Sequence, residues 1–360
     1  MNNTPHTNCL TLRLLHAAKG YKAVAFDIFD TLLKRDCAHP ADLFALMEVT
    51  HQAVLGFAGA RAAAEAETRQ TLGREVTLAE IYAHPALRGT DPAAECAAEL
   101  AMIAPNRPVA QAAAACHARG QKVYAVSDMY LPKEQIEAML QKCGLDFLDG
   151  VFVSCEYRVQ KRSGKLFKLF LQQTALRPAE VLFVGDSPRA DFAGAALAGI
   201  RCFLLPQPTP LPYTKNPADA VGGAAIATLQ NCCQNLSPSA ALGAELLGPL
   251  AVGFATWLHG QRAAIPGAKL VFLARDMYLV RQVYQLLYPE EETFYLKASR
   301  QSLLPALLQC PMNEQALALL ADTLPRQQLT QRQIAAYLGF DSPKAVSYTH
   351  LRAHETPEHL

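Results

Sequence analysis

Short apolar runs alternate with helix-compatible stretches from about residue 22 to residue 205. Each run is brief, rich in β-branched or aromatic residues and followed by a turn signal, which is typical of buried strands. Helical patterns lie between the runs, as at 132–142, which opens with Pro132 and continues KEQIEAML. This alternation predicts an α/β fold with a parallel sheet covered on both faces, whose chemistry gathers at the carboxyl ends of the strands. The predicted strands are 22–27, 122–126, 150–153, 181–184 and 201–204.

Residues 36–106 interrupt this rhythm. The interval holds no good strand and is rich in Ala, Leu and Glu, as in ARAAAEAETRQTL and DPAAECAAELAMI. A length of about 70 residues is long for a single crossover connection. We therefore expect a helical insertion that lies as a cap over the strand ends.

A proline-rich segment ends the alternating part of the chain. PQPTPLPYTKNP, residues 206–217, cannot continue a helix or a central strand. The chain beyond it is largely helical, with strands expected at 270–274 and 294–298. The sequence DMYL occurs at Asp128 and again at Asp276, which indicates either a decayed internal repeat or chance reuse of one turn. The expected organisation is a Rossmann-like core with its cap at 20–205, a linker at 206–218 and a smaller, mostly helical α/β unit at 219–345.

The composition excludes several classes of protein. The chain is 51% hydrophobic and 18% charged, so it can bury a core, and 33 Lys and Arg against 32 Asp and Glu give no electrostatic reason for a nucleic-acid or anionic-membrane partner. The start does not look like a secretory signal, and no stretch reaches about 20 uninterrupted apolar residues, so we expect no membrane insertion. Ten cysteines without a CxxC pair, of which Cys232 and Cys233 are adjacent, favour reduced thiols in a cytoplasmic protein.

The last fifteen residues have a different character. Residues 346–360, VSYTHLRAHETPEHL, show no apolar periodicity and many His and Thr residues. Back-translated in one frame, VSYTHLRAHET can spell the end of a transposon-type sequencing adaptor. We expect that the natural chain was cut near Ala345 by an assembly error, and we give no functional weight to His350, His354 or His359.

Four pieces that carry polar side chains succeed one another in a fixed order. An apolar strand ends at the nucleophile candidate Asp27 in AVAFDIFDTLL, and the next strand tip, in VYAVSDMY, carries Ser127. KRSGKLFKLF then offers Lys161 just before a helix start. In VLFVGDSPRADFAGAALAGI a strand runs into Asp186 and then Asp191.

In this order, with the helical interval between the first and second pieces, the chain resembles the haloacid dehalogenase (HAD) superfamily of hydrolases, in its branch with a helical, C1-type cap. The resemblance covers roughly residues 20–205. More narrowly, FDIFDTLL, SDMYLP and the downstream LARDMYL with KASR look like predicted HAD hydrolases associated with bacterial surface-polysaccharide biosynthesis. The resemblance implies a Rossmann-like hydrolase with a catalytic carboxylate after the first strand.

The resemblance also implies a Mg²⁺ site. Asp27 would attack phosphorus and form an aspartyl-phosphate, which divides one difficult step into two. Because this brings an anion to an anion, a hard cation held by oxygen ligands is needed. Asp27, Asp186 and the backbone carbonyl of Phe29 would hold Mg²⁺, and Asp191 would complete or orient its shell.

The phosphoryl group would be bound by neighbouring residues. Ser127 would donate a hydrogen bond to a phosphoryl oxygen, and Lys161 would neutralise charge on the nucleophile and the phosphate. Thr31 and Asp128 are expected beside them. Lys165 competes with Lys161, but Lys161 fits the family's Lys-x-x-x-x-Leu-Phe spacing, whereas Lys165 should already lie within the helix.

Structural explanations compete with these roles. Asp27 could be a turn residue, and Ser127 or Asp191 could cap the helix that comes after each of them. In the second unit, Arg275 with Asp276 and Ser299 with Arg300 could bind an anionic group, although we expect an ordinary ion pair at a domain junction there.

Phe29 departs from the common phosphatase pattern, which has an acid two residues after the nucleophile. Asp30 comes one residue later and is the candidate acid, unless a water or a cap residue replaces it or turnover is slow. Superfamily members that break carbon–halogen bonds also lack this acid, but they need no Mg²⁺. Because clustered carboxylates repel one another without a cation, Asp186 and Asp191 favour a phosphorylated ligand.

We therefore expect a cytoplasmic, Mg²⁺-dependent phosphatase that acts on a small phosphorylated metabolite, with a sugar phosphate as the first guess from the resemblance. The alternatives are a dehalogenase-like hydrolase, or a binding or scaffold protein of low turnover in polysaccharide biosynthesis. Nucleic acid is not expected as a partner.

Overall fold

The computed structural model describes residues 9–206, 217–234, 236–274, 276–298, 330, 332 and 333. By packing, the chain divides into Met1–Glu245 and Leu246–Leu360, here called the first and the second unit. Arg275, Ser299, Arg300, most of the expected linker and the segment 346–360 lie outside the described residues.

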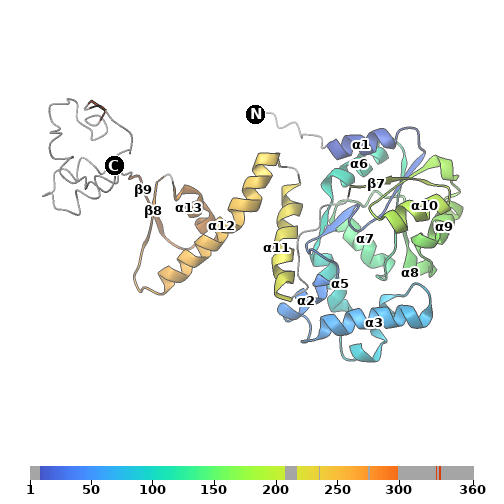
Figure 1. Ribbon diagram of the computed structural model, residues 1–360, viewed down its shortest axis with the longest axis horizontal. Coiled ribbons are helices and arrows are strands. Elements are labelled where there is room, and N and C mark those ends of the chain that lie inside the picture. The colour runs from blue at the N-terminus through green and yellow to red at the C-terminus, as the bar shows by residue number, and fades with distance from the viewer. Residues whose placement is uncertain are drawn as a thin grey trace, which may run out of the picture. The chain divides into compact units, whose positions relative to one another are not determined.

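The first unit is built on a five-stranded sheet of order β5-β4-β1-β6-β7, in which all neighbours are parallel (Figure 1). Each strand matches one that the apolar pattern predicts, so the α/β parallel-sheet prediction is confirmed. The strands are β1 (Ala23–Phe26), β4 (Lys122–Ser127), β5 (Gly150–Val153), β6 (Val181–Gly185) and β7 (Arg201–Leu204).

Alternate residues of the buried strands face opposite sides of the sheet, and each side packs against helices. Val24 and Phe26 of β1 pack in one apolar cluster, whereas Ala23 and Ala25 pack in another. The first cluster includes residues of α1 (Cys9–Ala17), α6 (Arg107–Ala118) and α7 (Lys133–Lys142). The second includes residues of α9 (Lys165–Thr174) and α10 (Gly194–Leu197). The remaining short elements are α8 (Ser154–Tyr157) and η3 (Pro178–Glu180).

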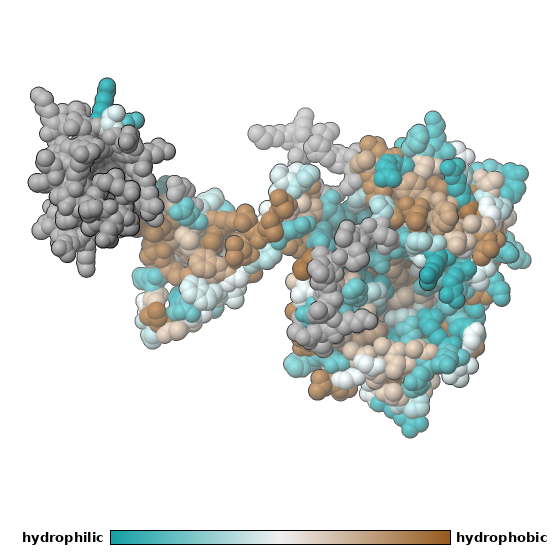
Figure 2. Space-filling model, viewed as in Figure 1, coloured by the Kyte–Doolittle hydropathy of each residue, from teal (hydrophilic) through white to brown (hydrophobic). Residues whose placement is uncertain are grey.

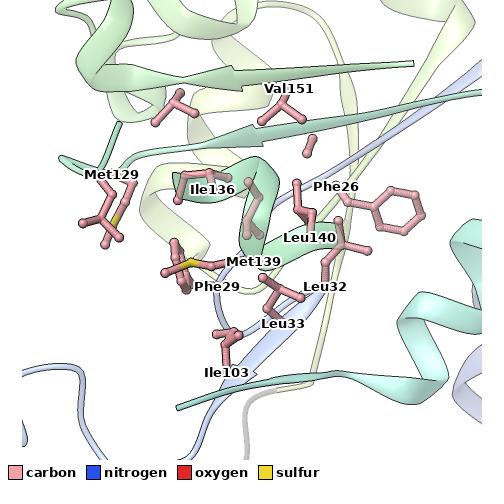
Figure 3. Close-up of a cluster of buried hydrophobic side chains, with 14 of the residues drawn as sticks. Phe26, Phe29, Leu32, Leu33, Ile103, Met129, Ile136, Met139, Leu140 and Val151 are labelled. Atoms are coloured by element: carbon pink, nitrogen blue, oxygen red, sulfur yellow. The ribbon is translucent and has the colours of Figure 1, made fainter. Parts of the chain in front are cut away.

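Side chains that come after β1 join the first of these clusters. Figure 3 shows Phe29, Leu32 and Leu33 beside Met139 and Leu140 of α7, and all five are buried. The loop after the first strand is therefore anchored in the core by apolar contacts, and this anchoring fixes the residues that flank Asp27.

An insertion of helices lies between β2 (Leu33–Arg35) and β3 (Ile103–Pro105), which pair antiparallel. β3 corrects the expectation that 36–106 contains no strand: three residues with one buried side chain give almost no alternating signal, and the pairing partner lies 68 or more residues away in sequence. The insertion contains α2 (Asp42–Val49), α3 (Phe57–Leu72), α4 (Leu78–Tyr82), η1 (Pro85–Leu87) and α5 (Pro92–Ala101).

The helix α11 (Pro217–Cys233), expected in the second unit, packs on the first. Ala220 contacts the buried Cys37 and Leu46, and the side chain of Asn231 donates to the carbonyl of Arg35 and to Asp36 Oδ1. The change of unit therefore comes after the proline-rich segment rather than within it.

The second unit contains part of α12 (Pro238–Ala263), the parallel strands β8 (Leu270–Leu273) and β9 (Thr293–Leu296), and α13 (Tyr278–Leu287) between them. Both expected strands are present. Phe272 and Tyr284 form its buried cluster with Ala255.

Among the described residues, α12 is long and apolar enough to cross a membrane by length and composition, with a mean hydropathy of 1.4 over its 18-residue window, of which 11% is buried. Leu246, Leu250 and Trp257 are exposed on it, and Figure 2 shows the brown apolar surface that results. A criterion of uninterrupted apolar runs misses this helix because Glu245 and Pro249 divide its apolar residues.

Candidate active site

Asp27 is the first residue after β1, and its backbone N–H donates to the carbonyl of Val184 on the neighbouring strand β6 at 2.8 Å. Asp186 is the first residue after β6, so the two carboxylates reach the same edge of the sheet. One carboxylate oxygen from each of Asp27, Asp186 and Asp191 lies within 4.8 Å of the others. The chain thus gathers three acidic side chains at the carboxyl ends of two adjacent central strands.

Lys161 lies among these carboxylates. Its Nζ is 2.5 Å from Asp27 Oδ1 and 2.6 Å from Asp191 Oδ1, and the residue is 3% exposed. It begins the 3₁₀ turn η2 (Lys161–Ser163), whereas Lys165 is exposed at the start of α9. Of the two lysines that the sequence left in competition, the structure places Lys161 at the nucleophile candidate.

The charges in this cluster do not balance. Three carboxylates and one ammonium leave a formal charge of −2, in a place where burial weakens the solvation of each charge. Burial raises the pKa of Asp27 to about 7; the Lys161 ammonium opposes this shift and the Asp191 carboxylate adds to it. Burial by itself would lower the pKa of Lys161, but the Asp27 and Asp191 carboxylates together raise it above its ordinary value. A divalent cation would neutralise the two negative charges that Lys161 leaves uncompensated.

Asp191 is clamped in place by its own loop. It lies in a π-helical turn, η4 (Pro188–Ala193), and its Oδ2 accepts the backbone N–H groups of Asp186 and Ser187, each at 2.9 Å. Its Oδ1 accepts from Lys161 Nζ. Since both oxygens are already bonded, this geometry suits a residue that orients Lys161 and the Asp186 loop.

Two glycines make this arrangement possible. A Cβ at Gly185 would lie 2.5 Å from Asp191 Cγ, and a Cβ at Gly194 would lie 2.9 Å from the carbonyl carbon of Lys161. Any larger residue would therefore push the Asp191 carboxylate or the Lys161 turn out of position. Reasoning from side-chain chemistry missed both positions, although the glycines of VGDSPRADFAGA were a visible signal.

Two further predicted site residues, Ser127 and Asp128, come at the end of the neighbouring strand β4. Ser127 ends β4 and is buried, and Asp128 accepts the backbone N–H of Lys161 with both carboxylate oxygens, at 2.8 and 3.1 Å. Burial raises the pKa of Asp128, and the Lys161 charge opposes that rise. Asp128 thus fixes the turn that carries Lys161.

Thr31 lies four residues after Asp27. Its side chain is fully buried, and within the described part of the chain its Oγ1 has no hydrogen-bond partner. A buried hydroxyl without a partner costs free energy, and the ordinary explanations are local strain, a catalytic role, or a bound water or ion.

Phe29 and Asp30 come after the nucleophile candidate in a tight turn. Phe29 is 9% exposed, and the guanidinium carbon of Arg35 lies 3.9 Å from the centre of its ring. Asp30 is exposed, has a left-handed backbone (φ 59°) and does not belong to the carboxylate cluster of Asp27. Apolar contacts and a stacked arginine therefore hold the aromatic side chain two residues after Asp27.

A cavity of about 600 Å³ opens beside this turn, between the strand tips and the helical insertion. Residues 29 and 30, Arg35 and Asp128 line it from the sheet side, and α2 and α3 line it with Phe44, Glu65 and Arg69. Arg35, Glu65 and Arg69 carried no motif, so the sequence alone gave no reason to select them.

The donor set fits Mg²⁺. Mg²⁺ prefers oxygen ligands and is usually bound by one or two carboxylates together with substrate oxygens and water. Asp27 and Asp186 supply such oxygens, Asp191 stands behind them, and the net charge of the cluster has the required sign and size.

Comparison with known proteins identifies the family of this part of the chain. The model of the haloacid dehalogenase-like hydrolases matches residues 21–199, which contain the carboxylates, Lys161 and the helical insertion. This part of the chain therefore belongs to the haloacid dehalogenase-like hydrolase superfamily. No curated protein matches the chain.

Solved structures with a similar fold include both kinds of hydrolase. A HAD phosphatase from Thermococcus onnurineus has 20% sequence identity and a TM-score of 0.40, with 54% of this chain and 90% of that chain covered. The L-2-haloacid dehalogenase of Xanthobacter autotrophicus, with chloropropionic acid covalently bound, has 22% identity and a TM-score of 0.37, with 51% and 76% covered. A HAD hydrolase from Bacillus subtilis bound to magnesium has 20% identity and a TM-score of 0.38, with 51% and 88% covered.

Proposed function

We propose that the protein is a Mg²⁺-dependent phosphatase that hydrolyses a small phosphorylated metabolite through a phosphoryl group on Asp27. The observation that carries the proposal is the cluster of Asp27, Asp186 and Asp191 around Lys161, which leaves two negative charges uncompensated beside a cavity of about 600 Å³. A sugar phosphate is the first substrate to test, and the helical insertion is proposed as the cap that selects it.

The residues divide the work of phosphoryl transfer. An Asp27 carboxylate oxygen attacks phosphorus, and the bond to the leaving oxygen breaks; water then attacks the aspartyl-phosphate and restores the carboxylate. Lys161 neutralises charge on Asp27 and on the phosphoryl oxygens, and Ser127 and Thr31 donate hydrogen bonds to those oxygens. Asp27, Asp186 and the backbone carbonyl of Phe29 would hold Mg²⁺, which would supply further neutralisation. Asp128 and Asp191 keep Lys161 in position.

Phosphate release tests this proposal directly. Purified protein with Mg²⁺ should release phosphate from p-nitrophenyl phosphate or from members of a sugar-phosphate panel. Asp27→Asn should abolish release, because an amide cannot serve as the nucleophile, whereas Lys165→Met, at the exposed lysine four residues after Lys161, should leave it intact. Activity that survives Asp27→Asn would contradict the proposal.

Dehalogenation is the second candidate, and Phe29 is the observation that favours it, because carbon–halogen cleavage through a carboxylate needs no acid for the leaving group. Its test is halide release from 2-chloropropionate in the presence of EDTA. The uncompensated charge beside Lys161 argues against it, since a reaction without a cation gives Asp186 no role. Absence of both phosphate and halide release would favour a binding or scaffold role, which we propose would lie in surface-polysaccharide biosynthesis.

A further inference from the structure

The residues on the side of the site opposite Lys161 determine whether a leaving group can be protonated as it departs. In an in-line displacement at phosphorus, the leaving oxygen lies opposite the attacking oxygen. Lys161 contacts Asp27 and also pairs with Asp191, so Lys161 and its second partner lie on the attacking side. A proton for the leaving oxygen would have to come from the wall of the cavity.

Phe29 lines the cavity two residues after the nucleophile candidate, and its ring is fixed by contacts with its neighbours. The Arg35 guanidinium stacks 3.9 Å from its ring centre, and Arg35 in turn donates to both carboxylate oxygens of the buried Glu99, at 3.1 and 3.3 Å. A stacked cation contributes about 0.5–2 kcal/mol. For another acid to take this place, the ring, the arginine and the ion pair would all have to move.

The other charged side chains that line the cavity in the described part of the chain are Arg35, Arg69, Glu65, Asp128 and Asp30. Arg35 and Arg69 keep their protons at any working pH. Glu65 accepts from Arg61 and Arg69, at 3.0 and 3.1 Å, and those bonds need its ionised form. Asp128 accepts the Lys161 N–H with both oxygens. Asp30 is exposed in its left-handed turn. Among the described residues of the wall, both guanidinium groups are already paired with carboxylates, and each carboxylate other than the exposed Asp30 already accepts hydrogen bonds.

We propose that the substrate of this site carries a leaving group that departs as a stable anion without being protonated: an acyl phosphate, a phosphoanhydride or the phosphate ester of an acidic hydroxyl. This inference rests on the proposed function. In the first step the Asp27 oxygen bonds to phosphorus, and the bond to the leaving oxygen breaks with its electron pair on that oxygen, which leaves as an anion. In the second step water bonds to phosphorus, Asp27 leaves as a carboxylate, and the protons of water pass to phosphate and solvent.

The test compares leaving groups of similar size and different acidity on the full chain with Mg²⁺. The series is 4-nitrophenyl, 4-chlorophenyl, phenyl and cyclohexyl phosphate, with acetyl phosphate and pyrophosphate as the acyl and anhydride arms. We expect kcat/KM to fall by about 10²–10⁴-fold from 4-nitrophenyl to cyclohexyl phosphate, the factor that a general acid normally supplies. Equal values along the series would overturn the inference. If neither acetyl phosphate nor any ester is hydrolysed, the proposed function itself fails, and the inference fails with it.

A matched pair of variants identifies the cause. Phe29→Asp adds a carboxyl group at the proposed gap, and Phe29→Asn has the same shape without the acid. Phe29→Asp should have at least about tenfold higher kcat/KM on cyclohexyl phosphate than Phe29→Asn. A gain of this size is smaller than the rate factor that a well-placed general acid supplies. Equal activity of the pair would overturn the inference. If kcat/KM changes little along the series in the unmodified protein but falls strongly in Asp30→Asn, Asp30 is the acid and the inference is overturned. The series measured on the unmodified protein tests the inference even if the variants at Phe29 do not fold.

Discussion

Asp27 combines two properties that conflict in most proteins: it is 5% exposed, and it belongs to a cluster with two other carboxylates. Burial raises its pKa to about 7 from 3.8, so without metal the folded chain holds a proton that the unfolded chain releases. Without metal, an ionised Asp27 therefore lowers the free energy of unfolding.

This shift predicts a pH dependence with a definite sign. Because the folded pKa of Asp27 is the higher one, its stabilising contribution is fully present below 3.8 and is lost as the pH rises through about 7. In EDTA, the stability of the unmodified chain relative to Asp27→Asn should therefore fall over that interval, as measured by urea denaturation at several pH values. Mg²⁺ should stabilise the unmodified chain more above that pKa than well below it, because a protonated carboxyl binds metal poorly. Parallel pH curves for the two proteins would contradict this account.

At the scale of single residues, the sequence predicted the acidic tips and Lys161 but not what positions them. Asp27, Asp186 and Asp191 were selected because they come after strands or glycines in a recognisable order. The clamp from Asp128 to the Lys161 turn and the Arg35 stack on Phe29 join residues 33 and 6 positions apart through the folded backbone, and no local pattern encodes them.

At the scale of elements, the helical insertion is held by a buried ion pair rather than by apolar packing alone. Arg61 of α3 and Glu95 of α5 are both fully buried, with Nε–Oε2 at 2.7 Å and Nη2–Oε1 at 2.8 Å. Tyr82 donates to Glu95 at 2.8 Å, and the Arg61 guanidinium lies 4.7 Å from the ring centre of Tyr130. The ion pair thus joins three helices of the insertion to the loop after β4.

Removal of one member should leave the other charged and buried. Arg61→Met should lower the free energy of unfolding by about 3–5 kcal/mol, because Glu95 loses its counter-ion in a fully buried position. Arg74→Met, which breaks the half-exposed pair with Glu80, is the matched control and should have a much smaller effect, since solvent partly screens that pair. Urea denaturation of both variants measures the difference, and equal effects would show that the buried pair does not hold the insertion.

The strands were predictable because each is a short, buried run of β-branched or aromatic residues in a parallel sheet. β3 was not, because an edge pair of three residues depends on its partner rather than on its own pattern. The place of α11 was also hidden, because its contacts with Cys37 and the loop around Asp36 come from residues about 180 positions earlier.

At the scale of the whole molecule, the two units differ in how much apolar surface they expose. The first buries its apolar residues around one sheet, whereas α12 exposes Leu246, Leu250 and Trp257 among the described residues. We propose a cytoplasmic protein, and cell fractionation checks this. The chain should be recovered in the soluble fraction, and recovery in membranes that resist carbonate extraction would contradict the proposal.

The central claim is that Asp27 accepts a phosphoryl group when Mg²⁺ is present. Acetyl phosphate, followed by borohydride reduction and peptide mass spectrometry, tests it most directly, because reduction converts an aspartyl-phosphate to homoserine at the modified position. The account predicts Mg²⁺-dependent conversion at position 27, and none in Asp27→Asn. Conversion at another carboxylate, or equal conversion in EDTA, would contradict it.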